Sequence, residues 1–156
     1  MHTSILKRCA EARDAEGLFG VLKALNATTS YRFTGIYRFD DRWVRSVWLY
    51  DRENPDIQFG SDVLWDDSYC RLTATEGDAC EIVNALDDTR LMMHAARERV
   101  QSYVAVLLRT PDKGAFGTLC HYDVCPGETA PDVFATLREA RDLVEDTLWR
   151  QLGASV

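Results

Sequence analysis

Three neighbouring residues, Cys120, His121 and Cys125, carry side chains that zinc prefers as ligands. The spacing Cys-His-x-x-x-Cys does not match a structural zinc motif, and no fourth ligand is apparent. Adjacent residues of a strand also point to opposite faces, so Cys120 and His121 cannot easily serve one site. We therefore expect no metal here, with Cys120 in the core and His121 on the outer face.

Cys70 and Cys80 are the next candidates for chemistry, as a redox pair. A reactive thiol needs a nearby cation or helix N-terminus that lowers its pKa. Arg71 and an expected helix start offer a weak form of both. The chain has five cysteines in 156 residues, an odd number in a chain with room for a large core, which does not indicate a disulfide framework. We expect reduced and mostly buried thiols.

A few isolated residues could also bind ligands. His94 could hold haem through one axial position, although a lone histidine is more often part of the core or the surface. Arg90 or Arg109 could bind a phosphate or a carboxylate, although solvated surface arginines are commoner. The chain has no Gly-x-Ser-x-Gly, His-Glu-x-x-His, Walker or dinucleotide motif. Its acidic pairs are better explained as turns and helix caps.

Aromatic residues form the set most suggestive of a ligand site. Apolar rings with hydroxyl tips are what small-molecule pockets present. The same residues are equally typical of an ordinary core, and the sequence favours neither interpretation. The set consists of Tyr31, Phe33, Tyr37, Phe59, Trp65, Tyr69 and Tyr103.

The composition of the chain excludes some classes of binding partner. A net charge of −7 argues against nucleic acid and against an anionic membrane surface. No apolar run approaches the ~20 residues of a membrane span, and the first residues show no signal-peptide pattern. Hydrophobic residues make up 46% of the chain and charged residues 28%, as in globular proteins. We expect a cytoplasmic protein with one domain over residues 1–156.

The first half of the chain is expected to form a helix and a hairpin. Apolar residues three and four apart predict a helix over residues 4–25, in which Gly17 and Gly20 either weaken the helix or mark a break near its middle. Residues 31–39 alternate, which predicts a half-buried strand with the odd-numbered residues, Tyr31 to Phe39, on one face. A second strand from Trp43 to Tyr50 completes the hairpin.

The second half is expected to mix short helices with a second hairpin. Asp66 or Asp67 caps a short helix over 66–75, residues 81–83 form a short strand, and an Asp caps a helix over 89–99. Residues 103–108 are apolar on both faces, which predicts a central, fully covered strand. Residues 115–123 return as its antiparallel partner.

The last helix is expected to start at Thr129, with Pro131 in its first turn, and to end just before Gly153. Its apolar stripe has charged flanks. The stripe could cover the sheet or pair with a second copy of the chain, and both alternatives stand. It consists of Val133, Leu137, Ala140, Val144 and Leu148.

The second hairpin resembles the closing hairpin of bacterial GAF domains. It consists of an apolar strand, a short turn and the sequence Gly117-Thr118-Leu119-Cys120-His121-Tyr122-Asp123. Ser68-Tyr69-Cys70 is similar to the small-aromatic-Cys element that starts a GAF helix, and Asp87-Asp88-Thr89-Arg90-Leu91 to the family's Asp-rich segment. Order and spacing match over about residues 18–150.

The resemblance implies an α+β fold with a central antiparallel sheet of five to six strands. The N- and C-terminal helices would pack on one face, and short helices and loops would form a ligand pocket on the other. We expect the pocket residues to be Tyr37, Phe59, Trp65, Tyr69, Cys70, Tyr103, Thr118 and Cys120.

GAF domains bind cyclic nucleotides, bilins, haem, amino acids, metals or no known ligand, so the fold alone leaves the cofactor unknown. Bilin-binding members carry a Cys-His pair before the penultimate strand, whereas Cys120-His121 lies in the last strand. The first functional hypothesis is a sensor that binds a small molecule and signals to a partner protein or across a homodimer. The alternatives are a redox enzyme of the free methionine sulfoxide reductase type, using Cys70 or Cys120, and a docking scaffold without ligand.

Overall fold

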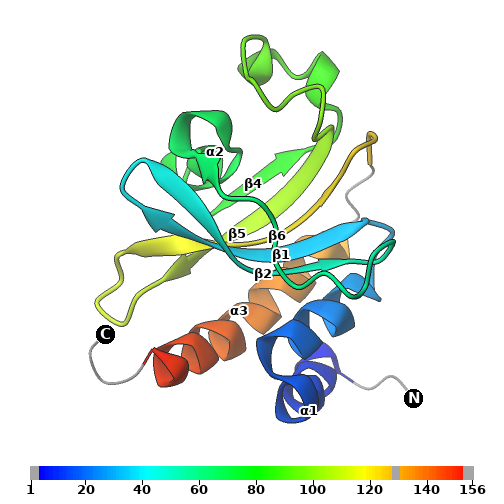
Figure 1. Cartoon of the computed structure of the whole chain (residues 1–156), viewed down its shortest axis with the longest axis vertical. Coiled ribbons are helices and arrows are strands. Elements are labelled where there is room, and N and C mark those ends of the chain that lie inside the picture. The colour runs from blue at the N-terminus through cyan, green and yellow to red at the C-terminus, as the bar shows by residue number, and fades with distance from the viewer. Residues whose placement is uncertain (1–3, 128–130, 153–156) are drawn as a thin grey trace.

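The computed structural model describes residues 4–127 and 131–152. Its centre is a six-stranded sheet in the order β3-β2-β1-β6-β5-β4, with every neighbouring pair antiparallel (Figure 1). The predicted antiparallel sheet of five to six strands is confirmed. The strands are β1 (Phe33–Asp40), β2 (Trp43–Asp51), β3 (Val63–Leu64), β4 (Ala79–Ile82), β5 (Ser102–Arg109) and β6 (Ala115–Asp123).

Two long helices, α1 (Ile5–Asn26) and α3 (Pro131–Gln151), cover one face of the sheet (Figure 1). All five residues of the α3 stripe are buried, in one cluster with Leu22 of α1 and Val106 of β5. The stripe therefore covers this chain's own sheet, which decides between the two alternatives. The predicted helix start at Thr129 lies outside the described residues, while Pro131 is in the first turn and α3 ends at Gln151, just before Gly153, as expected.

The opposite face is covered by short elements, as the fold class predicted. These are the helix α2 (Cys70–Thr75) and the 3₁₀ turns η1 (Trp65–Asp67), η2 (Ala85–Asp87) and η3 (Thr89–Leu91). They pack on a second buried cluster that includes Tyr37, Tyr103 and Cys120 from the sheet. Among the described residues no helix combines the length and the apolar character needed to span a bilayer.

Strand alternation places most residues as expected. Tyr37 and Phe39 of β1 pack in the α2-side cluster, whereas Ile36 packs under the long helices. Tyr31 was expected on the same strand face as Tyr37, and this prediction is wrong. Tyr31 precedes β1 and lies in the core under the long helices. The strand over 103–108 is confirmed as fully covered, with all of its residues buried.

Two predicted helices in the loop-rich half differ from the structure. The 66–75 helix begins only at Cys70, and neither Asp66 nor Asp67 caps it. Trp65 packs edge-on against Phe39 at 5.0 Å between ring centroids, and its backbone N–H donates to the carbonyl of Arg42 at 2.7 Å. This anchorage holds residues 65–67 in a 3₁₀ turn, so the helix cannot start there.

The predicted helix over 89–99 is wrong beyond its first turn. Asp88 does act as a cap, since its Oδ1 accepts from the Arg90 N–H at 3.0 Å. After Leu91 the chain forms irregular turns. The Arg97 guanidinium donates to the carbonyl of Met92, which a helix over 89–99 would pair with a backbone N–H, and also to the carbonyl of Leu86. The short strand expected at 81–83 is β4, two residues earlier at its start.

His121 is buried, which corrects its expected place on an outer, exposed face. It does point away from Cys120, toward the long helices. Its Nδ1 lies 2.7 Å from Thr34 Oγ1, which in turn accepts from the Asn26 side chain at 2.9 Å, and its ring stacks on Tyr31. Burial lowers the pKa of His121 to about 3, so the imidazole is neutral.

Gly17 divides α1, as predicted for the glycines of this helix. Its φ of 70° and ψ of −155° are non-helical and belong to a region of backbone angles that residues with a Cβ atom avoid. We expect Gly17→Ala to lower the free energy of unfolding by about 1–3 kcal/mol in urea titrations. Glu11→Ala, at an exposed position of the same helix, should change it by less than about 0.5 kcal/mol. Equal stability of both variants would contradict the requirement for glycine.

His121 should make stability depend on pH. The pKa of His121 in the folded protein lies below the ordinary value of 6.5. Below pH 6.5 the unfolded chain therefore binds a proton at this residue that the native state does not bind. The free energy of unfolding should therefore fall by up to ~1.4 kcal/mol per pH unit as pH drops from 6.5 toward 3. His121→Gln should flatten this slope between about pH 7 and 5.5, above the range of most carboxylates. Burial also lowers the pKa of His94, but this side chain is only partly buried, so His94→Gln should flatten the slope less than His121→Gln. An unchanged slope in His121→Gln would refute the assignment.

Candidate functional site

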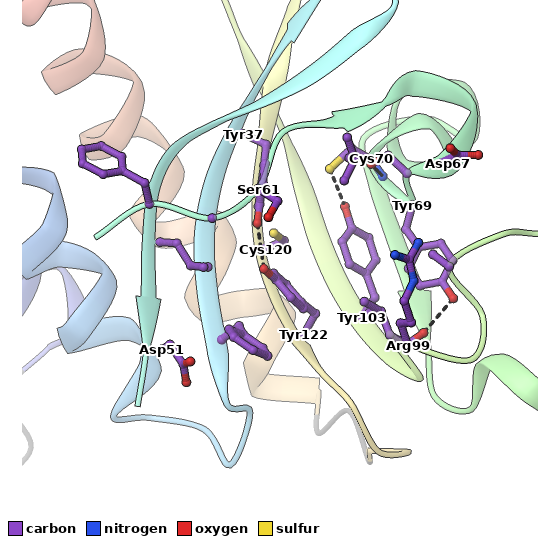
Figure 2. A pocket seen from close by; sticks show the side chains of 18 of the residues that line it. Tyr37, Asp51, Ser61, Asp67, Tyr69, Cys70, Arg99, Tyr103, Cys120 and Tyr122 are labelled. Carbon is purple, nitrogen blue, oxygen red and sulfur yellow. Dashed lines mark hydrogen bonds between the residues drawn. The ribbon is translucent and has the colours of Figure 1, made fainter. Parts of the chain in front are cut away.

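A pocket of about 470 Å³ opens on the α2 side of the sheet (Figure 2). Its floor consists of β1, β2, β5 and β6, and its walls consist of α2, the start of β3 and two irregular segments, 57–62 and 96–100. The volume lies within the usual range for small-molecule sites. The pocket and the two long helices therefore occupy opposite faces of one sheet.

The floor carries tyrosines from three strands. Tyr103 of β5 lies directly opposite Tyr122 of β6, and Tyr37 of β1 lies opposite Thr118 of β6. Cys120 and Tyr122 share a face because residues two apart in a strand do so. The hydroxyls of Tyr37 and Tyr122 are hydrogen-bonded at 2.7 Å, as the dashed line in Figure 2 marks.

The α2 wall is tied to this floor. Cys70 Sγ lies 3.2 Å from Thr118 Oγ1 and accepts a longer bond of 3.5 Å from the Tyr103 hydroxyl (Figure 2). Tyr69 packs edge-on against Tyr103 and donates its hydroxyl to the carbonyl of Val100 at 2.7 Å. These contacts fix the two walls relative to each other, so the pocket is preformed.

The pocket presents neutral polar groups. Burial raises the pKa values of Tyr37 and Tyr103 well above the ordinary value of 10 and that of Tyr69 to about 12. Burial likewise raises the pKa of the Cys120 thiol. These groups can exchange hydrogen bonds with a ligand, but they are poorly suited to transfer protons near neutral pH.

Three charged residues also line the pocket. Asp51 forms a two-pronged ion pair with Arg32, with N–O distances of 2.9 and 3.0 Å. Arg99 and Asp67 have no ion pair or side-chain hydrogen bond to another described residue. Figure 2 shows Arg99 on the side of Tyr69 and Tyr103, and the Asp67 carboxylate turned outward.

Most of the predicted pocket residues lie where expected. Trp65 does not line the pocket, because its ring is used against Phe39, and Thr118 lies behind Cys70 rather than at the pocket surface. A role in ligand binding stays a prediction for all of them. The predicted residues that line the pocket are Tyr37, Phe59, Tyr69, Cys70, Tyr103 and Cys120.

Several lining residues were missed. Tyr122 could have been found, since it follows Cys120 by two in the same strand, and Leu49 has a similar signal in β2. Ser61 and Arg99 come from irregular segments, where no periodicity marks which side chains turn inward. Phe33 from the aromatic set lines the pocket, whereas Tyr31 does not.

The remaining candidates lie elsewhere. Arg90 is bound by Asp88 and Glu76, and Arg109 by Asp78. Cys80 is buried outside the pocket lining, so it does not share the site with Cys70. His94 packs on Tyr69 rather than lining the pocket. Within the described part of the chain, no three Cys, His, Asp or Glu side chains are grouped for a metal.

No family model and no curated protein matches the sequence. Solved structures with similar folds do exist. The free methionine-R-sulfoxide reductase of Neisseria meningitidis in complex with its substrate is 13% identical at a TM-score of 0.71, over 92% of this chain and 84% of that chain. The GAF domain of an Acinetobacter phosphoenolpyruvate-protein phosphotransferase is 11% identical at a TM-score of 0.71, over 95% of this chain and 94% of that chain. The phycoerythrobilin-bound GAF domain of a cyanobacterial phytochrome is 15% identical at a TM-score of 0.67, over 95% of this chain and 96% of that chain.

The burial of the cysteines predicts their reactivity. All five are free thiols, and Cys125 alone among them is exposed. Burial raises the pKa of Cys9 to about 11 and that of Cys80 to about 12, which lowers their thiolate fraction further. With iodoacetamide at about pH 7.5, peptide mass spectrometry should find Cys125 alkylated at least about tenfold faster than the others. All five should react alike in guanidinium. Fast alkylation of Cys70 or Cys120 in the native protein would contradict this.

Proposed function

Because the chain has a GAF-like fold, we propose that it is a small-molecule-binding regulatory module. The observation that carries the proposal is the preformed pocket of about 470 Å³ on the face that the long helices leave free. Well-packed interiors leave few voids larger than a water molecule, so an aromatic space of this size indicates a site rather than a core.

The tyrosine pair supplies a specific feature for recognition. A phenolic hydroxyl has one proton, and the bond between Tyr37 and Tyr122 uses only one of the two. No described residue accepts the second proton. The pair therefore offers one hydrogen-bond donor to an acceptor atom of a ligand, while the surrounding rings contribute apolar contact area.

The sheet provides a route from the pocket to the helices. Alternate residues of β1 and β6 face opposite sides, so Tyr37 and Tyr122 contact the pocket while Ile36 and Leu119 pack under the long helices. A ligand that shifts these strands would change the support of both helices. We propose that the helices pass this change to a partner protein or across a homodimer.

A cysteine-dependent reductase is the second candidate, because Cys70 and Cys120 line the same pocket. Two thiols could reduce a sulfoxide to a thioether, with the sulfoxide oxygen leaving as water and the thiols joining in a disulfide. Both thiols are buried, and burial raises the pKa of Cys120, which disfavours the Cys120 thiolate that such chemistry would use. Fast alkylation of either thiol, and loss of sulfoxide reduction in serine variants, would favour this candidate.

The sensor proposal predicts a bound molecule. Native mass spectrometry of protein purified from its own host, with an absorbance scan, should show a mass above that of the polypeptide. Ser61 is an exposed residue of the pocket lining. Ser61→Trp should remove this extra mass, because the large indole ring would fill the pocket. Gln58→Trp, in the same segment but outside the lining, should retain it. A bare polypeptide mass for all three proteins would contradict the proposal and favour a docking scaffold.

A further inference from the structure

Arg99 is the only basic residue among those described that line the pocket. Its guanidinium has no ion pair or hydrogen bond with another described side chain or carbonyl. Arg32 and Arg90 differ in this respect, since carboxylates hold both of them. A cation without a counter-ion at the rim of a pocket is positioned to bind an anion from outside.

The backbone fixes the position of Arg99. The N–H groups of Arg99 and Val100 both donate to the carbonyl of Ala96, at 3.0 and 2.9 Å, which closes a turn just before β5. The positive charge of Arg99 also acts on the Tyr69 hydroxyl, where it opposes the rise in pKa that burial causes. Arg99 therefore lies near the aromatic wall, in agreement with Figure 2.

The carboxylates of the lining do not cancel this charge. Both oxygens of Asp51 bind Arg32, and they also accept from the Asn54 side chain and the Glu53 N–H, each at 3.0 Å. The Asp67 carboxylate points outward in Figure 2. The free charge that faces the pocket is thus positive, although the chain as a whole carries −7.

We propose that the ligand is an amphipathic organic anion, with its oxyanion on Arg99 at the rim and its apolar body among the tyrosines. This inference rests on the proposed binding function and names its ligand class. The planar guanidinium can bind a carboxylate or a phosphate through two parallel hydrogen bonds. The aromatic rings of Phe33, Tyr37, Tyr103 and Tyr122 then provide the apolar environment for the rest of the molecule.

Two fluorescent probes with the same skeleton test the inference. Anilinonaphthalene sulfonate carries an anionic group that N-phenylnaphthylamine lacks, and both fluoresce when they leave water. We expect the sulfonate to bind about tenfold more tightly in fluorescence titrations. Arg99→Gln should abolish this difference and leave N-phenylnaphthylamine binding unchanged. Arg71→Gln, which removes an equal charge at an exposed site outside the lining, should preserve the difference.

The outcomes separate this inference from the proposed function. If Ser61→Trp does not weaken N-phenylnaphthylamine binding, or the wild type does not bind it, the pocket itself fails as a binding site. If both probes bind equally and Arg99→Gln has no effect, the anion inference is overturned while the pocket stands.

Displacement of N-phenylnaphthylamine distinguishes the two kinds of oxyanion. Stronger displacement by decanoate would support a carboxylic acid as the natural ligand class, and stronger displacement by decyl phosphate would support a phosphate ester. Decanol is the neutral control. Displacement by decanol at least as strong as by either anion would overturn the inference.

Discussion

The pairing of β1 with β6 is the contact on which the rest of the structure depends. It joins the N-terminal hairpin to the closing hairpin, which lies far along the chain, in a register that sets Gly35 against Cys120. The strands approach closely at Gly117, where an added Cβ would lie 1.8 Å from the carbonyl oxygen of Tyr37. A side chain there would clash with backbone, which gives a physical reason for the glycine of the Gly-Thr-Leu-Cys sequence.

The same pair of strands builds both layers of the molecule. Thr34 and His121 meet on the helix side, where they join the Asn26 side chain of α1. Tyr37 and Tyr122 meet on the other side as the hydrogen-bonded floor of the pocket. Burial keeps the polar groups neutral on both sides, with a lowered pKa for the imidazole and raised values for the phenols. The chemistry of the site therefore follows from where the sheet puts its side chains.

Periodic elements could be predicted from the sequence, and irregular ones could not. The α3 stripe follows from spacing alone, because one face of the helix must be buried. The strand over 115–123 follows from the turn before it, as the antiparallel return of the apolar strand. The 89–99 segment does not form a helix, because the Arg97 side chain binds the carbonyls of Met92 and Leu86, and the spacing of apolar residues does not predict such side-chain bonds to the backbone. His121 was misplaced since alternation predicts the direction of a side chain but not whether a helix covers that face. Alternation places Tyr37, Tyr103 and Cys120 at the pocket and would also have placed Tyr122, whereas no such pattern exists for Arg99 and Ser61.

The division of the pocket between sheet and loops has an evolutionary consequence. The floor residues also hold the two hairpins together, so a mutation at Tyr37 or Cys120 would disturb folding as well as the site. The rim residues Ser61 and Arg99 are exposed, with side chains that support no other part of the described chain. Descendants of this protein could therefore exchange one ligand for another through a few rim substitutions while the scaffold stays intact.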